Sequence, residues 1–301
     1  MSALASAPEL VAALGGLWHG RRGMARCPAH SDRTPSLSIT DGDNGWPVFC
    51  CFGGCPQDAV IDALRSRGLW PDRGERIEYS APDPAVVEAR RLEEAKKRQK
   101  RRDSARSIWR DAAPDTCREV VRTYWRSRGL TIDPPPTIRS GHVWHPFEHR
   151  RMPAMVAAVH GADGRLQGVG ITYLRPDGRG KAEIEQPRIT RGELAGGAVR
   201  LAPAGPKLGL AEGLEDAATV QQETGLPCWA ALGTSNLAKV ALPAVVREMV
   251  ILADRGEAGE AAAQTAVNAY SGTGRMVRVA WPPGEHKDFN AALTACARAA
   301  A

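Results

Sequence analysis

The spacing of apolar residues divides the chain into two regions. Up to residue 130, apolar positions recur every three or four residues, which predicts helices over residues 8–18, 58–67, 86–110 and 115–128. Gly68 and Gly129 directly follow two of these segments, as expected of residues that end a helix. A Pro-rich break is expected over residues 79–83. The segment between the first two helices is rich in Cys, Pro, Gly and Asp, and it cannot fold by apolar burial alone.

Beyond three consecutive prolines at residues 134–136, the pattern becomes that of an α/β fold. Residues 155–174 alternate apolar and polar positions around the turn 162–164, which predicts a β-hairpin. Strand and helix signals then alternate, and that order predicts an α/β unit with a largely parallel sheet. The strands are expected at residues 208–213, 227–232, 249–254 and 276–281, and the helices at 216–223, after Ser235, and at 257–270.

Charge narrows the range of partners. The 301 residues carry a formal net charge of +6, which suits a polyanionic partner. The run KKRQKRR at residues 96–102 is either part of a solvated helical linker or an arm that contacts phosphates. No stretch reaches about 18 consecutive apolar residues, and residues 1–20 lack a basic start and a long apolar run. We therefore expect a soluble, cytoplasmic protein with no membrane partner.

The cysteines gather near the start of the chain. Four of the seven lie among the first 55 residues, which indicates metal binding and not a disulfide scaffold. Cys27 with His30, and Cys51 with Cys55, form two pairs that are each short enough for one turn to aim both side chains at one ion. Zinc favours four such ligands in a tetrahedron, and this set leaves no position open for catalysis, so we predict a structural Zn²⁺. Cys50 is a competing thiol, but the tighter spacing to Cys55 favours Cys51.

This cysteine-rich segment resembles a known family. The run CPAHSDRTPSLSI, followed by FCCFGGC and a helix, resembles the zinc-binding domain of bacterial, phage and plasmid primases over residues 27–69, and its last cysteine spacing is similar to the phage and plasmid branch. In that family the zinc stabilises a small sheet whose exposed face contacts single-stranded template DNA. The resemblance implies template contacts for Arg33, Ser36, Ser38 and Phe52, with base stacking on the aromatic ring. The alternative is that these four residues hold ordinary turn and sheet positions.

Acidic residues end the predicted strands of the second region. Glu212 lies at the end of the strand 208–213, and Asp216 follows one helical turn later. Asp254 ends the strand 249–254, and Asp288 comes after the last strand. Open α/β sheets place their ligands at the carboxyl ends of strands, where clustered carboxylates repel one another unless a hard divalent cation or a positive partner joins them. The sequence therefore predicts a site for Mg²⁺ or Mn²⁺.

The acidic arrangement resembles the Toprim domain of primases, topoisomerases and some nucleases, over residues 207–293. In that family a glutamate before a glycine and an Asp-x-Asp pair bind metal and the reacting phosphate, and these positions match Glu212 and Asp254. The resemblance also matches Asp216 to the second acid of the primase version and Asp288 to a late acid.

Two positions depart from the family pattern. Gly256 stands where the second aspartate of the pair is expected, and His286 stands where primases often carry another acid. Glu257 could reach the same ion from its neighbouring turn position, or the site could bind metal poorly and be catalytically weak.

The connecting region also resembles the segment that precedes Toprim in many mobile-element primase-like proteins. The matching runs are PAMVAAV at 153–159, ITYLRPDGRGKA at 171–182 and GGAVRL at 196–201. Arg175, Arg179 and Lys181 in this region are expected either to contact nucleotide phosphates or template backbone, or to lie on a solvent-facing loop.

These resemblances imply a DNA primase that makes short RNA primers on single-stranded DNA from ribonucleoside triphosphates, by Mg-dependent nucleotidyl transfer. The chain has no GxxxxGKS or GxxxxGKT motif, so a separate replicative helicase is the expected partner. One alternative is a catalytically weak zinc and Toprim DNA-binding scaffold in mobile-element replication, and another is a Toprim nuclease. A topoisomerase would need a strand-cleaving tyrosine on an additional domain, which the context of the four tyrosines does not suggest.

The predicted fold class is therefore a multidomain α+β chain. We expect a small N-terminal zinc-ribbon-like module of primase type over residues 1–72 and a charged helical linker over 73–130. An α+β segment over 131–206 should precede a C-terminal α/β Toprim domain with a largely parallel sheet over 207–301.

Overall fold

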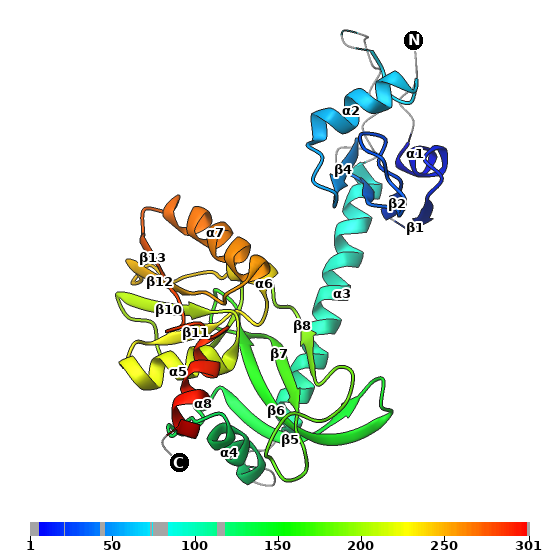
Figure 1. The fold of residues 1–301 in the computed structure, drawn as a ribbon. Helices are drawn as coiled ribbons and strands as arrows, with labels where there is room; N and C mark the ends of the chain where they lie inside the picture. Colours follow the sequence, from blue (N-terminus) through cyan, green and yellow to red (C-terminus); the bar gives the residue numbers. More distant parts are fainter. Residues whose placement is uncertain are drawn as a thin grey trace. The chain divides into compact units, whose positions relative to one another are not determined.

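The computed structural model describes residues 6–20, 22–42, 46–72, 74, 84–112 and 118–299. The chain forms two compact units, residues 1–94 and residues 95–301 (Figure 1). The Pro-rich break predicted at 79–83 and the start of the helix predicted at 115–128 lie outside the described residues. No described helix combines the length and the apolar character that crossing a membrane requires.

The first unit is built on a four-stranded antiparallel sheet in the order β1-β2-β3-β4. Helices α1 (Ala7–Ala13) and α2 (Gln57–Ser66) pack on this sheet around a core that includes Leu10, Leu37 and Leu64. The prediction of one helix over residues 8–18 is wrong at its end, because Trp18 pairs in β1 with β2. The strands are β1 (Leu17–His19), β2 (Arg22–Ala25), β3 (Leu37–Asp41) and β4 (Pro47–Cys51).

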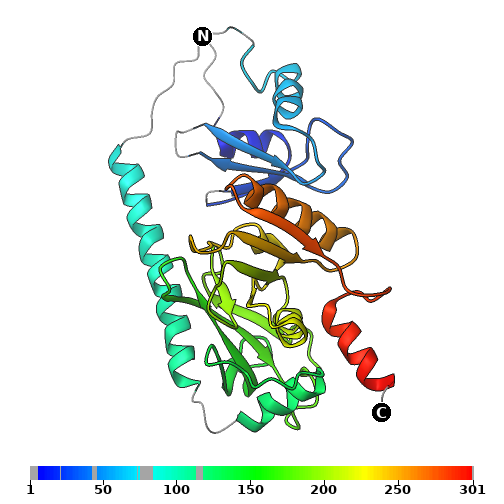
Figure 2. The ribbon, with the colours of Figure 1, turned by 90° about the vertical axis from the view of Figure 1, so that its left-hand side faces the viewer.

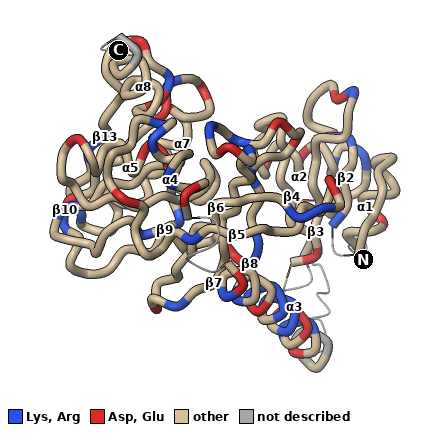
Figure 3. The backbone as a smooth tube through the Cα atoms, turned by 90° about the horizontal axis from the view of Figure 1, so that it is seen from below, with Lys and Arg blue, Asp and Glu red and all other residues tan. Residues whose placement is uncertain are grey.

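Helix α3 (Pro84–Asp111) contains the basic run, and Lys and Arg follow one another along it (Figure 3). Its last turns pack Ala105, Ile108 and Trp109 against the sheet of the second unit. Three arginines of α3 form ion pairs with the carboxylate of Glu193. The N···O distances from Arg98, Arg101 and Arg102 are 3.7, 3.8 and 2.9 Å. The C-terminal half of α3 is thus fixed to the second unit by apolar contacts and ion pairs.

The second unit contains a mixed sheet of nine strands in the order β13-β12-β10-β11-β9-β6-β7-β8, with β5 also paired to β6. The strands from β13 to β11 are parallel, whereas β9 and the strands beyond it pair antiparallel. The predicted hairpin at 155–174 and the predicted parallel sheet are both present. The strands are β5 (Ile138–His145), β6 (Arg150–His160), β7 (Leu166–Tyr173), β8 (Arg188–Gly192), β9 (Ala198–Arg200), β10 (Lys207–Ala211), β11 (Cys228–Ala230), β12 (Glu248–Leu252) and β13 (Met276–Ala280).

Helices cover both faces of the parallel strands (Figure 2). On one face α7 (Glu257–Ser271) packs Ala263, Ala266 and Tyr270 against alternate residues of β10 and β12. On the other face lie α5 (Leu214–Thr224) and α8 (Phe289–Ala299), and α4 (Arg118–Ser127) adds Tyr124 and Trp125 to the same core. The helix predicted after Ser235 is a single turn, α6 (Thr234–Leu237).

Candidate functional site

Three cysteines and one histidine converge in the first unit. The ligand atoms of Cys27, His30, Cys51 and Cys55 all lie within 4.8 Å of one another. Cys50 is exposed and outside this cluster, because successive side chains of β4 point to opposite faces. The structure therefore places Cys51 at the site, as the spacing predicts. Three thiol groups and one imidazole are a donor set that fits a structural Zn²⁺.

Asp32 organises the loop that carries two of these ligands. Its Oδ2 accepts the backbone N–H of Cys27 at 2.8 Å and the hydroxyl of Ser36 at 2.7 Å, and its Oδ1 lies 3.9 Å from His30 Nε2. The bond from the Cys27 amide, with those from Ser36, lowers the pKa of Asp32. His30 turns its other nitrogen, Nδ1, to within 3.2 Å of Cys55 Sγ. Asp32 was missed in the sequence, although it stands inside the CPAHSDRTPS motif.

The environment of the thiols differs along the cluster. Burial raises the pKa of Cys27 to about 12. Burial opposes ionisation of Cys51 too, but the backbone N–H groups of Cys55 and Gly53 help to lower the pKa of Cys51 to about 7. Thiolate is the form that binds metal, and the backbone N–H groups of Cys55 and Gly53 favour that form at Cys51. Glycine is required at 53, because an added Cβ would lie 2.8 Å from Cε1 of His30.

Two of the residues that the primase resemblance assigns to template contact are exposed. Phe52 directly follows a zinc ligand and is 64% exposed, with the Arg22 guanidinium 5.7 Å from its ring centroid. Arg33 is exposed on the loop after His30. Ser38, in contrast, is buried and accepts a hydrogen bond from Arg22 at 2.9 Å, so it holds the sheet together. Ser36 is engaged with Asp32.

In the second unit, a cavity of about 530 Å³ lies at the carboxyl ends of β10 and β12. Glu212 directly follows β10, Asp216 lies in the first turn of α5, and Asp254 follows β12. These acids and Asp288, which precedes α8, line the cavity, whereas Glu257 does not. The structure thus brings four of the five predicted acids together. Four cationic side chains line the same cavity: Arg128, Lys181, Arg188 and Lys287.

The acids of this cavity disfavour one another's ionisation. Burial, followed by the charges of Glu212 and Asp288, raises the pKa of Asp254 to about 6. Burial also raises the pKa of Asp216 to about 7, with added repulsion from Asp288 and Asp254, and it raises that of Glu212. Oδ1 of Asp254 is buried without a hydrogen-bond partner. An unpaired carboxylate oxygen among mutually repelling acids fits a divalent cation such as Mg²⁺ or Mn²⁺.

Two of the acids are held by the start of α8. Asp216 Oδ1 accepts the backbone N–H of Asn290 at 3.0 Å, and Asp288 Oδ1 accepts that of Ala291 at 2.6 Å, which caps the helix. Within the described ranges, the zinc ligands are the one group of three or more potential metal ligands that converges closely. Glu212 and Asp254, whose carboxylates are not held by α8, could hold a divalent cation and stay its predicted ligands.

Gly256, which departs from the Toprim pattern, has a backbone conformation that would strain any other residue. It precedes α7 with φ 107° and ψ 160°, a region that essentially only glycine adopts. An added Cβ would meet no atom within 4 Å, so space is not the obstacle. Glu257 begins α7 and is exposed. Neither residue supplies a second carboxylate beside Asp254.

A buried acid that the sequence analysis missed forms part of the cavity wall. Glu215 is only 6% exposed; it accepts the hydroxyl of Tyr124 at 2.5 Å and lies 3.1 Å from Lys181 Nζ. Burial opposes its charge, but Lys181 and then Tyr124 lower the pKa of Glu215, so the carboxylate is ionised. The signal in the sequence is the acidic pair in EGLED, of which only Asp216 was singled out. Arg175 lies outside the cavity and pairs with Glu183 at 2.9 Å.

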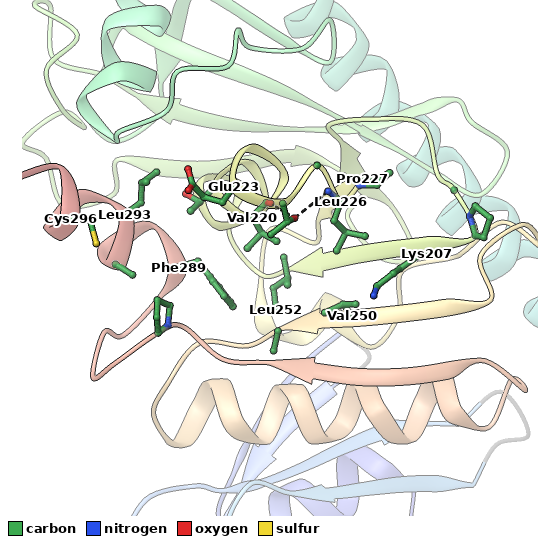
Figure 4. A pocket seen from close by; sticks show the side chains of 18 residues that line it. Lys207, Val220, Glu223, Leu226, Pro227, Val250, Leu252, Phe289, Leu293 and Cys296 are labelled. Atoms are coloured by element: carbon green, nitrogen blue, oxygen red, sulfur yellow. Dashed lines mark hydrogen bonds between the residues drawn. The ribbon is translucent and has the colours of Figure 1, made fainter.

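A larger cavity, of about 940 Å³, lies between α5 and α8 (Figure 4). Its walls are mostly apolar, and the charged residues that line it are Lys207 and Glu223. A single acid and a single base give no basis for binding a cation and a triphosphate together. The smaller carboxylate cavity is the candidate catalytic site.

Parallel strands that end in acids, a glycine after the first acid and helices on both faces define a Toprim domain. A family model described as "Toprim domain" matches residues 207–299, and a second, "Domain of unknown function (DUF7146)", matches residues 99–201. The chain therefore carries a Toprim domain at residues 207–299.

Solved structures similar to the chain include three primase fragments. The zinc-binding and RNA polymerase domains of the Aquifex aeolicus primase are 15% identical, with 99% of this chain and 85% of that chain covered and a TM-score of 0.43. The primase fragment of the bacteriophage T7 primase-helicase is 18% identical, with 60% and 68% covered and a TM-score of 0.39. A DNA primase domain from Pseudomonas aeruginosa is 14% identical, with 65% and 73% covered and a TM-score of 0.43. No curated protein matches the chain.

Proposed function

We propose that this chain is a DNA primase that joins ribonucleotides into short RNA primers on a single-stranded DNA template. The observation that carries the proposal is the Toprim cavity, where four predicted acids lie beside cationic side chains. Carboxylates that can hold a divalent cation, next to cations that can bind phosphates, are the groups that transfer of a nucleotidyl unit from a triphosphate requires.

The residues of the cavity divide into two roles. Lys181, Arg188 and Lys287 would bind the triphosphate of the incoming ribonucleotide and orient its α-phosphorus. Glu212 and Asp254 would hold Mg²⁺ or Mn²⁺, which when bound would neutralise the charge that develops during transfer. The 3′-hydroxyl of the growing primer loses its proton to solvent and attacks the α-phosphorus. A new P–O bond forms, the bond from the α-phosphorus to the oxygen bridging to the β-phosphate breaks, and pyrophosphate leaves with the electrons of that bond.

The zinc module is proposed to hold the template strand. Phe52 offers an exposed ring for base stacking, and Arg33 offers a charge for the phosphate backbone. Zn²⁺ bound by Cys27, His30 and the two later cysteines would stabilise the sheet that presents them. A replicative helicase on a separate chain remains the partner that we expect.

The proposal is tested by incorporation of labelled ribonucleotides on single-stranded DNA with Mg²⁺ or Mn²⁺. Wild-type protein should give short RNA products, and Glu212→Gln should reduce their yield by at least about 100-fold, because a cation ligand is lost. Glu223→Gln is the matched control, since Glu223 is an exposed acid at the far end of α5 and lines the other cavity. Absence of product from zinc-loaded wild type with either cation would contradict the proposal.

The same assay decides whether Glu257 contributes. Glu257 is exposed and lies outside the cavity, so Glu257→Gln should retain activity within about twofold of wild type. A loss as large as that of Glu212→Gln would show that the start of α7 rearranges to bring Glu257 to the reacting phosphate.

A second candidate function is favoured by the conformation of Gly256. Because neither Gly256 nor Glu257 places a carboxylate beside Asp254, the site has one acid fewer than the Toprim pattern provides. The chain would then be a zinc and Toprim scaffold that binds DNA without polymerising. In that case Glu212→Gln should keep wild-type DNA affinity while neither protein makes primers. Shortening of end-labelled DNA in parallel reactions would identify a nuclease instead.

A further inference from the structure

The turn between β5 and β6 carries an exposed aromatic surface that none of the functions above uses. Trp144, near the end of β5, is 52% exposed, and Phe147, in the turn, is 64% exposed. His149 adds a third ring, 6.4 Å from that of Trp144 between centroids. Exposed apolar side chains that are grouped together, unlike single scattered ones, indicate a binding surface. We call residues 142–151 the aromatic turn.

The aromatic turn is held rigidly from beneath by His145. This side chain is only 1% exposed; its Nδ1 accepts the backbone N–H of Glu148 at 3.0 Å, and its Nε2 donates to the carbonyl of Gln186 at 3.0 Å. The ring of Tyr173 packs against it edge-on at 4.5 Å between centroids, and the Tyr173 hydroxyl donates to the carbonyl of Trp144 at 2.7 Å. Trp144 and Phe147 are thus presented on a fixed backbone, which lowers the entropy cost of binding.

The charges around the two rings are mainly positive. Arg151 pairs directly with Trp144 across the two strands, so both side chains lie on the same exposed face. Arg150 is also exposed, but it pairs with buried His145 and so lies on the opposite face of the two strands. Glu148 is the single acidic residue of residues 142–151 and lies 3.8 Å from Arg150. An exposed aromatic ring beside an arginine suits a chain of stacked bases joined by phosphates.

The aromatic turn is joined to the wall of the carboxylate cavity. Gln186, which His145 binds, lies two residues before Arg188, and Tyr173 directly follows Thr172; both Arg188 and Thr172 line the cavity. The aromatic turn and the cavity wall are therefore connected through these neighbouring residues of the second unit.

We propose that the aromatic turn is a stacking platform for single-stranded nucleic acid, with bases on Trp144 and Phe147 and a phosphate at Arg151. If the chain is a primase, as proposed above, the strand is the template beyond the nucleotide being copied. The platform itself needs no polymerisation, so it can be tested separately.

The test measures binding of a fluorescently labelled oligodeoxythymidylate to the full, zinc-loaded chain by anisotropy. Trp144→Leu should weaken binding by about 10-fold, because one base loses its aromatic partner, whereas Trp144→Phe should stay within about threefold of wild type. Met276→Ala is the matched control, since Met276 is an exposed apolar side chain on β13, 57% exposed, outside the aromatic turn. Arg151→Gln should reduce the slope of log affinity against log salt by about 0.7, as expected for one phosphate contact with a single strand.

Each outcome separates the platform from the primase proposal. If wild type and Trp144→Leu bind the oligonucleotide equally well, the platform is overturned even if primers are made, and a protein partner becomes the better occupant. Equal losses of affinity in Trp144→Leu and Trp144→Phe would overturn it as well. Dependence of binding on the aromatic ring without primer synthesis would support the platform and remove the primase function. Phe147→Leu repeats the comparison should Trp144→Leu fail to fold.

Discussion

The ionised carboxylate of Glu215 lies deep beside a cavity already crowded with acids. Its charge is tolerated because Tyr124 and Lys181 both reach it, from α4 and from the loop after β7. Removing one partner of a buried pair costs more than the pair contributes, since the remaining charge stays in a poorly solvating environment.

Replacing Glu215 by glutamine should therefore destabilise the second unit by about 2 kcal/mol, because Lys181 loses its counter-ion while shape is preserved. Urea unfolding of the second unit measures this change. Glu183→Gln breaks the Arg175 pair at a side chain that is 82% exposed, and it should change the free energy of unfolding by less than about 0.5 kcal/mol. Similar losses in the two variants would refute the special role of the buried pair.

Asp32 has a comparable supporting role at the zinc ligands. Asp32→Asn should lower zinc affinity by about 10-fold, because the carboxylate fixes the Cys27 backbone and lies beside His30. Competition with a chromophoric chelator measures the affinity. Asp58→Asn, at an exposed acid of the same unit, should leave it unchanged, and an undiminished affinity in Asp32→Asn would show that the ligands need no such support.

Helices and strands whose apolar residues keep one regular spacing from end to end were predicted well from the sequence. Strands β10, β12 and β13 and helix α7 lie within two residues of their predicted bounds. Helix α1 was extended too far because Leu17 and Trp18 continue the helical spacing, while pairing with β2 decides their structure. Three-residue β9 is too short to show alternation.

The candidate sites were predictable to the extent that their residues are close in sequence or end a strand. The four zinc ligands and the four cavity acids follow from spacing and from strand ends. The Lys181 to Glu215 pair joins residues 34 positions apart, and the exposure of Glu257 depends on the backbone at Gly256; neither leaves a local pattern.

The backbone conformation of Gly256, at the start of α7, should make the second unit sensitive to substitution at this position. Gly256→Asp, which would restore the Toprim pattern, should destabilise the second unit by about 1–3 kcal/mol, because φ 107° strains any other residue. Gly272→Ala at the other end of α7 is the control: its φ of −63° suits alanine, so stability should be equal or slightly higher. Urea unfolding compares both with wild type, and an undisturbed Gly256→Asp would mean that this turn is free to adopt another conformation.

On the scale of the whole molecule, the two units have different sources of stability. The first has a small core supplemented by the metal ligands, whereas the second buries a nine-stranded sheet under helices on both faces. A small domain of this kind depends on its metal, because its buried apolar surface alone does not offset the loss of chain entropy.

Removal of zinc with a strong chelator should consequently unfold the first unit and leave the second intact. Hydrogen exchange followed by mass spectrometry should show lost protection in the sheet β1 to β4, with unchanged protection in β6, β10 and β12. Addition of zinc should restore the protection. Retained protection of β3 after complete chelation would show that apolar burial suffices, and loss in β10 would show that the two units unfold together.

The shortness of β9 has a mechanical consequence for the carboxylate cavity. This three-residue strand is where the antiparallel and parallel halves of the sheet join, and the cavity is lined from both halves. The ion pair between Lys181, in the loop after β7, and Glu215, in α5, connects the same two halves at a second point. Closing or widening the cavity thus requires both bending of the sheet at β9 and a change in the contact between Lys181 and Glu215.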